Sequence, residues 1–152
     1  MRISKHISYK EATQSQTATR LGIPNVPSQY DVQNMQLLAE KVFEPLREFF
    51  DVPIYVSSFY RSREMNKAIG GSSRSQHCEG RAIDLDDVYG GVTNAEMFQF
   101  IANILDYDQL IWEFGNDENP AWVHVSYVSE DQNRKQMLRA TKKNGKTIYE
   151  PL

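Results

Sequence analysis

Three side chains of types that bind metal ions, His77, Asp84 and His124, stand out in the sequence. Zinc binds histidine nitrogen and carboxylate oxygen, and a catalytic zinc site keeps three protein ligands and one open position for water. Asp84 follows His77 by seven residues, and Gly80 between them permits a tight turn that lets both side chains converge. His124 lies in a separate apolar run, so it joins them if its strand neighbours that of Asp84.

Each of these three residues also has an ordinary structural interpretation. A histidine on a strand is more often a packed or surface residue than a ligand, and an aspartate after a strand is usually a turn residue. A loop histidine is usually solvated. Taken one at a time, the three residues therefore predict no metal site, and the prediction depends on their spacing.

That spacing resembles the sequence pattern of the M15 zinc peptidases, which include D-Ala-D-Ala carboxypeptidases and phage L-alanyl-D-glutamate endolysins. Every fixed position of the pattern Ser-x-His-x-x-Gly-x-Ala-x-Asp is present from Ser75 to Asp84, and Trp-x-His-x-Ser is present from Trp122 to Ser126. The segment 57–62 is similar to the family's Ser-Gly-Tyr-Arg-Ser segment. The N-terminal layout resembles a compact subgroup of this family with a leading helical region, so the resemblance covers most of the chain.

The resemblance implies a fold and a reaction. The fold is α+β, shared with the Hedgehog signalling domain, with an antiparallel sheet and helices packed against it. His77, Asp84 and His124 would bind one zinc ion, and the reaction would be hydrolysis of a peptide bond in peptidoglycan stem peptides. The bond would be the D-Ala-D-Ala terminus or an internal bond such as L-Ala-D-Glu. Arg61 would hold the substrate carbonyl or the developing oxyanion, where a fixed positive charge matters most, and its ordinary interpretation is a surface salt-bridge arginine.

Amide hydrolysis at zinc also needs a general base for the attacking water. Several family members carry this base three residues before the last zinc histidine, where this chain has Ala121. Glu113 is the best remaining candidate, because it lies on a strand that we expect to pair with the strand of His124. Asp117 and Glu118 are weaker candidates, and the ordinary interpretation of Glu113 is a solvent-facing strand carboxylate.

Two further residues in these patterns, Ser75 and Trp122, have two interpretations each. Ser75 is a polar substrate contact or a cap of the local backbone. Trp122 shares the strand face of His124, so it lines a substrate cleft or packs in the core. Cys78 lies beside His77 but has no place in the family pattern, and we expect it to be a bystander. We expect His6 to be solvated in a frayed N-terminus.

On the sequence alone, a second function stays open. The chain would be a Hedgehog-like zinc-binding module with weak or no catalysis that binds cell wall or a protein partner, because this fold can also bind partners without cutting them. The departure at Ala121 supports this alternative. A carboxylate within reach of a zinc-bound water would favour the enzyme.

The elements that must position these residues follow from apolar periodicity and turn residues. We expect helices over 7–21, 32–49 with a kink near Pro45, 62–69 and 94–105. We expect strands over 53–58, 81–85, 109–114 and 121–128, a polar loop over 72–80 and a hairpin turn at 142–146. Helices come first and a mostly antiparallel sheet follows, which is an α+β order.

Length and composition bound the remaining possibilities. The chain has 152 residues, which fits one domain over residues 1–152, expected to be a monomer. A net charge of −3 gives no sign of a nucleic-acid partner, and one cysteine excludes an intrachain disulfide. We expect no membrane span and no signal peptide, so the protein would be cytoplasmic as synthesised and would reach cell wall by a phage-type release.

Overall fold

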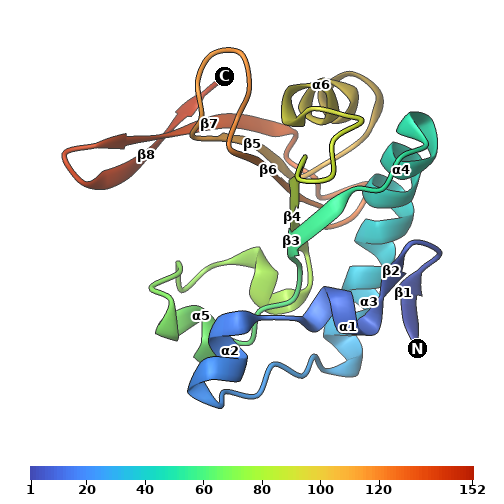
Figure 1. The fold of residues 1–152 in the computed structure, drawn as a ribbon, viewed down its shortest axis with the longest axis vertical. Coiled ribbons are helices and arrows are strands. Elements are labelled where there is room, and N and C mark those ends of the chain that lie inside the picture. The colour runs from blue at the N-terminus through green and yellow to red at the C-terminus, as the bar shows by residue number, and fades with distance from the viewer.

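The computed structural model describes residues 1–152, and its central feature is a six-stranded sheet in the order β3-β4-β6-β5-β7-β8 (Figure 1). Its strands are β3 (Tyr55–Ser58), β4 (Ala82–Asp86), β5 (Gln109–Glu113), β6 (Trp122–Ser126), β7 (Gln136–Lys143) and β8 (Lys146–Pro151). All neighbouring strands are antiparallel except β5 and β7, which are parallel. With the helices that precede and cover this sheet, the fold is α+β, as predicted.

The N-terminal segment differs from the single helix that we expected over 7–21. It forms a small two-stranded sheet, β1 (Arg2–Ser4) and β2 (Ile7–Ser8), followed by two short helices, α1 (Tyr9–Thr13) and α2 (Gln16–Leu21). Ser8 and Ser15 each accept a backbone N–H at the start of a helix, and serine side chains favour such caps over helix interiors. A cap at Ser15 therefore splits the expected helix in two.

The prediction for His6 was also wrong. Its Nδ1 lies 2.6 Å from Glu44 Oε1, and Glu44 Oε2 accepts the backbone N–H of His6 at 2.9 Å. Ser4 donates to the same carboxylate. The N-terminus is therefore tied to the helix that carries Glu44, and no motif of the sequence marked this contact.

The long helix expected over 32–49 forms as three consecutive segments. They are α3 (Gln29–Leu38), a π-helical segment (Ala39–Phe43) and α4 (Glu44–Phe50). Glu44 donates its backbone N–H to Ala39, five residues back, just before Pro45. Proline has no N–H and its ring crowds the carbonyl four residues earlier, so a wider turn relieves the clash. The irregularity that we expected near Pro45 is therefore this π-helical segment.

The segment that precedes β4 carries more helix than expected. Ser62 caps α5 (Arg63–Ala68), which forms where a helix was expected, and a short 3-10 helix (Gln76–Glu79) lies within the expected loop. Gly80 ends it with a φ of 72°, and a Cβ there would lie 2.5 Å from the carbonyl oxygen of Asp31. Only glycine fits this turn, which directs the chain from His77 into β4.

The core lies on one face of the sheet. Leu110 and Trp112 of β5 and Val123 and Val125 of β6 point into it, and α6 (Asn94–Ile104) packs against these two strands. The Trp112 ring contacts that of Phe98 edge to face at 5.2 Å within this core. Because side chains alternate along a strand, the residues between these four point to the opposite face.

The β7–β8 hairpin turns at Asn144 and Gly145, both with positive φ, as the Asn-Gly pair predicts. It projects from the body of the protein in Figure 1, while α1, α2 and α5 gather near the end of β3. No helix combines the length and the apolar composition that crossing a membrane requires.

Candidate metal centre

The strand register brings Asp84 and His124 together. β4 and β6 are antiparallel neighbours, and Asp84 lies directly opposite His124. Directly opposed residues of an antiparallel pair point to the same face. His124 Nδ1 lies 2.9 Å from Asp84 Oδ1, so the condition on which the sequence argument depended, that these two strands are neighbours, is met.

His77 reaches the same point from the 3-10 helix. Its Nδ1 lies 2.7 Å from the backbone carbonyl oxygen of Phe59, which can only accept, so Nδ1 carries the proton. The other nitrogen, Nε2, faces Asp84 Oδ2 at 3.3 Å. A second partner that fixes the tautomer in this way is the usual arrangement of a metal-binding histidine.

The three side chains form one compact group. One ligand atom from each of His77, Asp84 and His124 lies within 4.8 Å of the others, and the two imidazole rings are 5.2 Å apart. The His77 side chain is 4% exposed, and those of Asp84 and His124 are 13% and 14% exposed. Two imidazoles and one carboxylate around an opening to solvent could hold a metal ion.

The charges within the group favour an ionised carboxylate. Burial alone would raise the pKa of Asp84, but His77 and His124 together hold it well below its ordinary value. Burial would lower the pKa of His124, but its hydrogen bond to Asp84 and the negative charges of Asp84 and Glu113 together outweigh burial and raise it. A metal ion bound here would displace a proton that His124 shares with Asp84, since metal binding requires neutral histidine.

Glu113 lies on the same face of the sheet, one strand away. It is opposite Trp122, while its neighbour on that face, Ile111, is opposite His124. Only 7% of Glu113 is exposed, and no side chain or backbone N–H donates to its carboxylate. Burial, opposed by the charge of His124 and aided by that of Asp84, raises the pKa of Glu113 to about 7. Glu113 is thus not the solvent-facing carboxylate of its ordinary interpretation.

The other two candidate bases lie away from this group. Asp117 pairs with Arg139, and its side chain is 91% exposed. Arg139 is aligned with Trp112, whose side chain enters the core on the other face of the sheet. Glu118 is exposed in the same loop. Of the three carboxylates, only Glu113 accompanies the histidines.

Arg61 is held close to the histidines by three hydrogen bonds. Its guanidinium donates to Asn66 Oδ1 at 3.0 Å and to Ser58 Oγ at 3.3 Å. Its backbone N–H donates to the carbonyl of His77 at 3.2 Å. The positive charge of Arg61 acts to lower the pKa of His124, so its field reaches the group.

Two contacts in this region were not predicted. Asn66 is 4% exposed and bridges Arg61 to the carbonyl of Ser72. A Cβ at Gly71 would overlap Asn66 Oδ1 at 2.1 Å, so the glycine after α5 was a sequence signal for a close contact. The carbonyl of Phe59 that orients His77 belongs to the backbone, so the type of residue at this position does not predict the contact.

The remaining predicted site residues lie nearby in different settings. Ser75 Oγ accepts the backbone N–H of His77 at 3.3 Å, so it caps the 3-10 helix. Trp122 is half-buried on the site face, and its ring lies 5.4 Å from that of Phe114. Cys78 is buried and does not belong to the ligand group, in agreement with the prediction.

The chain is similar to one family of known proteins along most of its length. A family model described as Peptidase M15 matches residues 5–126. This range contains Arg61, Glu113 and the candidate metal-binding residues His77, Asp84 and His124, called the metal group below, and it ends with β6. No curated protein matches the chain.

Proposed function

The chain belongs to the peptidase M15 family, and from this premise we propose that it is a zinc-dependent enzyme that hydrolyses a peptide bond in peptidoglycan stem peptides. The observation that carries the proposal is the convergence of His77, Asp84 and His124 on one face of the sheet, with Glu113 buried beside them. A peptidase needs both parts, a metal site and a base.

The donor set suits zinc better than the other common metals. Zinc takes imidazole and carboxylate in sites with three protein ligands, whereas calcium and magnesium prefer oxygen donors alone. The Nε2 atom of His77 and the Nδ1 atom of His124 both face Asp84, so these atoms and the Asp84 carboxylate would hold the ion. When bound, zinc supplies the Lewis acidity that activates water and polarises the scissile carbonyl.

Glu113 would move the proton in this reaction. A carboxyl group with a pKa near 7 can accept a proton from the attacking water and then donate it to the leaving amine. Burial without a hydrogen-bond donor is what raises its pKa, and the same combination keeps its oxygens free to contact water. Arg61, fixed by Asn66 and Ser58, would stabilise negative charge that develops on the carbonyl oxygen.

The second candidate, a zinc-binding module without catalysis, needs the metal group alone. A buried carboxyl group whose pKa lies near neutrality has no use in such a module and costs folding stability above that pH. Glu113 therefore favours the enzyme, and it supplies the base that Ala121 cannot.

The proposal is tested by incubating zinc-loaded protein with purified muropeptides and measuring product masses. We expect loss of a terminal D-alanine or cleavage at an internal bond, abolished by a chelator and restored by zinc. The masses identify the bond. Absence of any product from the full set of stem peptides, with zinc bound, would refute the proposed function.

A further inference from the structure

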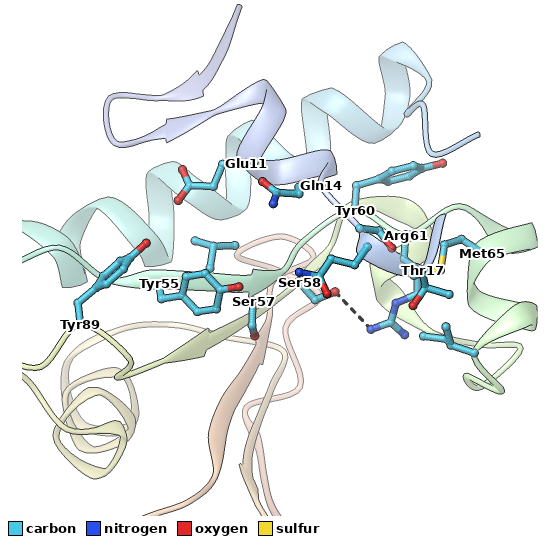
Figure 2. A pocket seen from close by; sticks show the side chains of 14 residues that line it. Glu11, Gln14, Thr17, Tyr55, Ser57, Ser58, Tyr60, Arg61, Met65 and Tyr89 are labelled. Carbon is cyan, nitrogen blue, oxygen red and sulfur yellow. Dashed lines mark hydrogen bonds between the residues drawn. The ribbon is translucent and has the colours of Figure 1, made fainter. Parts of the chain in front are cut away.

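A groove runs along the outer edge of β3. Its volume is about 590 Å³, and it lies between this strand and the α1–α2 segment. Figure 2 shows Glu11 and Gln14 on one side, Tyr55 and Ser57 on the other, and Arg61 at one end. The groove lies outside the metal group, because His77, Asp84 and His124 are not part of its lining.

β3 is an end strand of the sheet, paired with β4 alone. Such a strand leaves alternate N–H and C=O groups without a sheet partner, and proteins usually cover or disrupt such edges. In this protein α1 bonds to the chain only after β3 has ended, where Tyr60 donates its backbone N–H to the carbonyl of Ala12. The backbone of Tyr55–Ser58 therefore borders the groove with half of its hydrogen-bonding groups unpaired by the sheet.

The groove leads to the metal group. Ser58 lies opposite Asp84 in the strand register, and Ser57 Oγ donates to the backbone carbonyl of Asp84 at 3.3 Å. At the same end, Arg61 donates to Ser58 Oγ, the interaction drawn as a dashed line in Figure 2. A chain that leaves the metal group past Arg61 would enter the groove beside β3.

The lining suits an extended peptide better than a compact apolar ligand. Most of the lining side chains are polar, with one carboxylate from Glu11 and one guanidinium from Arg61. At the far end, the rings of Tyr55 and Tyr89 meet edge to face at 5.7 Å and are partly exposed. A peptide brings backbone donors and acceptors for the strand edge and side chains for these walls.

We propose that the peptide substrate binds in this groove as an extended strand added to β3, with its scissile end at Arg61. This inference rests on the proposed function and adds the binding mode of the substrate to it. Strand addition gives affinity through main-chain hydrogen bonds and selectivity through alternate side chains. The four residues of β3 span about 13 Å at about 3.3 Å per residue, which corresponds to about four substrate residues on one side of the scissile bond.

The first test measures binding separately from cleavage. A fluorescent stem pentapeptide is titrated into zinc-loaded Glu113→Gln protein, with and without the added change Gln14→Trp, which places an indole in the groove. We expect Gln14→Trp to raise Kd at least about tenfold, the equivalent of about 1.4 kcal/mol. The matched control is Gln36→Trp on the exposed side of α3, which should leave Kd unchanged. Equal Kd values with and without Gln14→Trp would overturn the groove as the binding site.

The second test asks whether the peptide pairs as a strand. Because the edge groups of β3 alternate, N-methylation of every second amide of the peptide should weaken binding about tenfold, and methylation of the intervening amides should not. Equal effects of both methylation patterns would overturn strand addition. If the peptide binds with this alternation and wild-type protein does not cleave it, the proposed function fails and the groove assignment stands.

Discussion

The carboxylates Asp84 and Glu113 lie on the same face of the same sheet, and their surroundings shift their pKa values in opposite directions. Asp84 contacts two histidines, and its pKa is held well below its ordinary value. Glu113 receives no hydrogen bond, and burial raises its pKa to about 7. Environments that separate two neighbouring carboxyl groups in this way divide their roles. Asp84 is suited to bind a positive ion and Glu113 to exchange a proton.

The strand register produces this difference. Asp84 is aligned with His124 across the β4–β6 pair, so its oxygens meet an imidazole. Glu113 is aligned with Trp122 across the β5–β6 pair, so its nearest cross-strand neighbour offers an indole ring. The partners of the two carboxylates, His124 and Trp122, are therefore only two positions apart on β6, yet one carboxylate is paired with a histidine and the other is not.

We expect the largest loss of activity when Asp84, the carboxylate that contacts the two histidines, is replaced. Asp84→Ala should abolish hydrolysis, a loss of more than about 10³-fold, because metal Lewis acidity contributes several kcal/mol to the transition state. Rates of muropeptide cleavage measure the loss, and Asp131→Ala, an exposed aspartate far along the chain, is the matched control. Activity within tenfold of wild type would remove Asp84 from the metal site.

Replacing Glu113, the carboxylate without a hydrogen-bond donor, should lower the catalytic rate without removing the metal. Glu113→Gln should lower kcat by about 10²–10⁴-fold, the range of general acid–base catalysis, while the bound zinc stays at the wild-type level. Glu118→Gln, in the loop that follows β5, is the control and should keep full activity. If Glu113→Gln loses zinc together with activity, Glu113 acts through the metal site and the division of roles is wrong.

Folding stability should separate the two carboxylates in metal-free protein. The pKa of Glu113 is raised in the folded state, so the unfolded state loses its proton first and wild type loses stability as pH rises from about 4.5 to about 7. Above pH 7, Glu113→Gln should therefore be more stable than wild type, by at most about 3 kcal/mol.

Asp84→Asn should act in the opposite direction. The pKa of Asp84 is lowered in the folded state, so its contribution is present above about pH 4 and is lost on acidification. Its replacement leaves His77 and His124 without their ionised partner, which should cost about 1–3 kcal/mol at neutral pH. Urea unfolding of both variants at pH 5 and pH 8 measures these differences. Changes of equal sign at pH 8 would contradict the contrast between the two carboxylates.

The smallest effect is a shift in the pH dependence of catalysis. Glu113 must be deprotonated to act as a base, so kcat/KM should rise about tenfold per pH unit and level off at or below pH 7, since the charge of bound zinc lowers the pKa of Glu113. The residual activity of Glu113→Gln should lack this acidic limb. A limb that persists unchanged in Glu113→Gln belongs to another group.

The candidate metal group was predictable from sequence because His77 and Asp84 lie at a short, fixed spacing and His124 lies in a second short pattern, from Trp122 to Ser126. His77, Gly80 and Asp84 form one turn and one strand, and the strands of Glu113 and His124 pair as expected. The contacts that orient these residues were harder to predict from the sequence. The Phe59 carbonyl is backbone, and the position of Asn66 beside Arg61 depends on how α5 packs.

Other parts of the fold depend on long-range pairing that local patterns do not encode. The parallel pairing of β5 with β7 joins strands separated by β6 in the chain. The apolar and polar order of residues 7–21 was compatible with one helix, yet capping by Ser15 divides it. In both cases, a tertiary or side-chain contact outweighed the local periodicity.

Zinc stoichiometry of the purified protein tests the central claim most directly. Metal analysis under zinc-replete conditions should find one zinc ion per chain in wild type and in Glu113→Gln, and none in His124→Ala. Wild-type protein without stoichiometric zinc, or His124→Ala that retains it, would contradict the account.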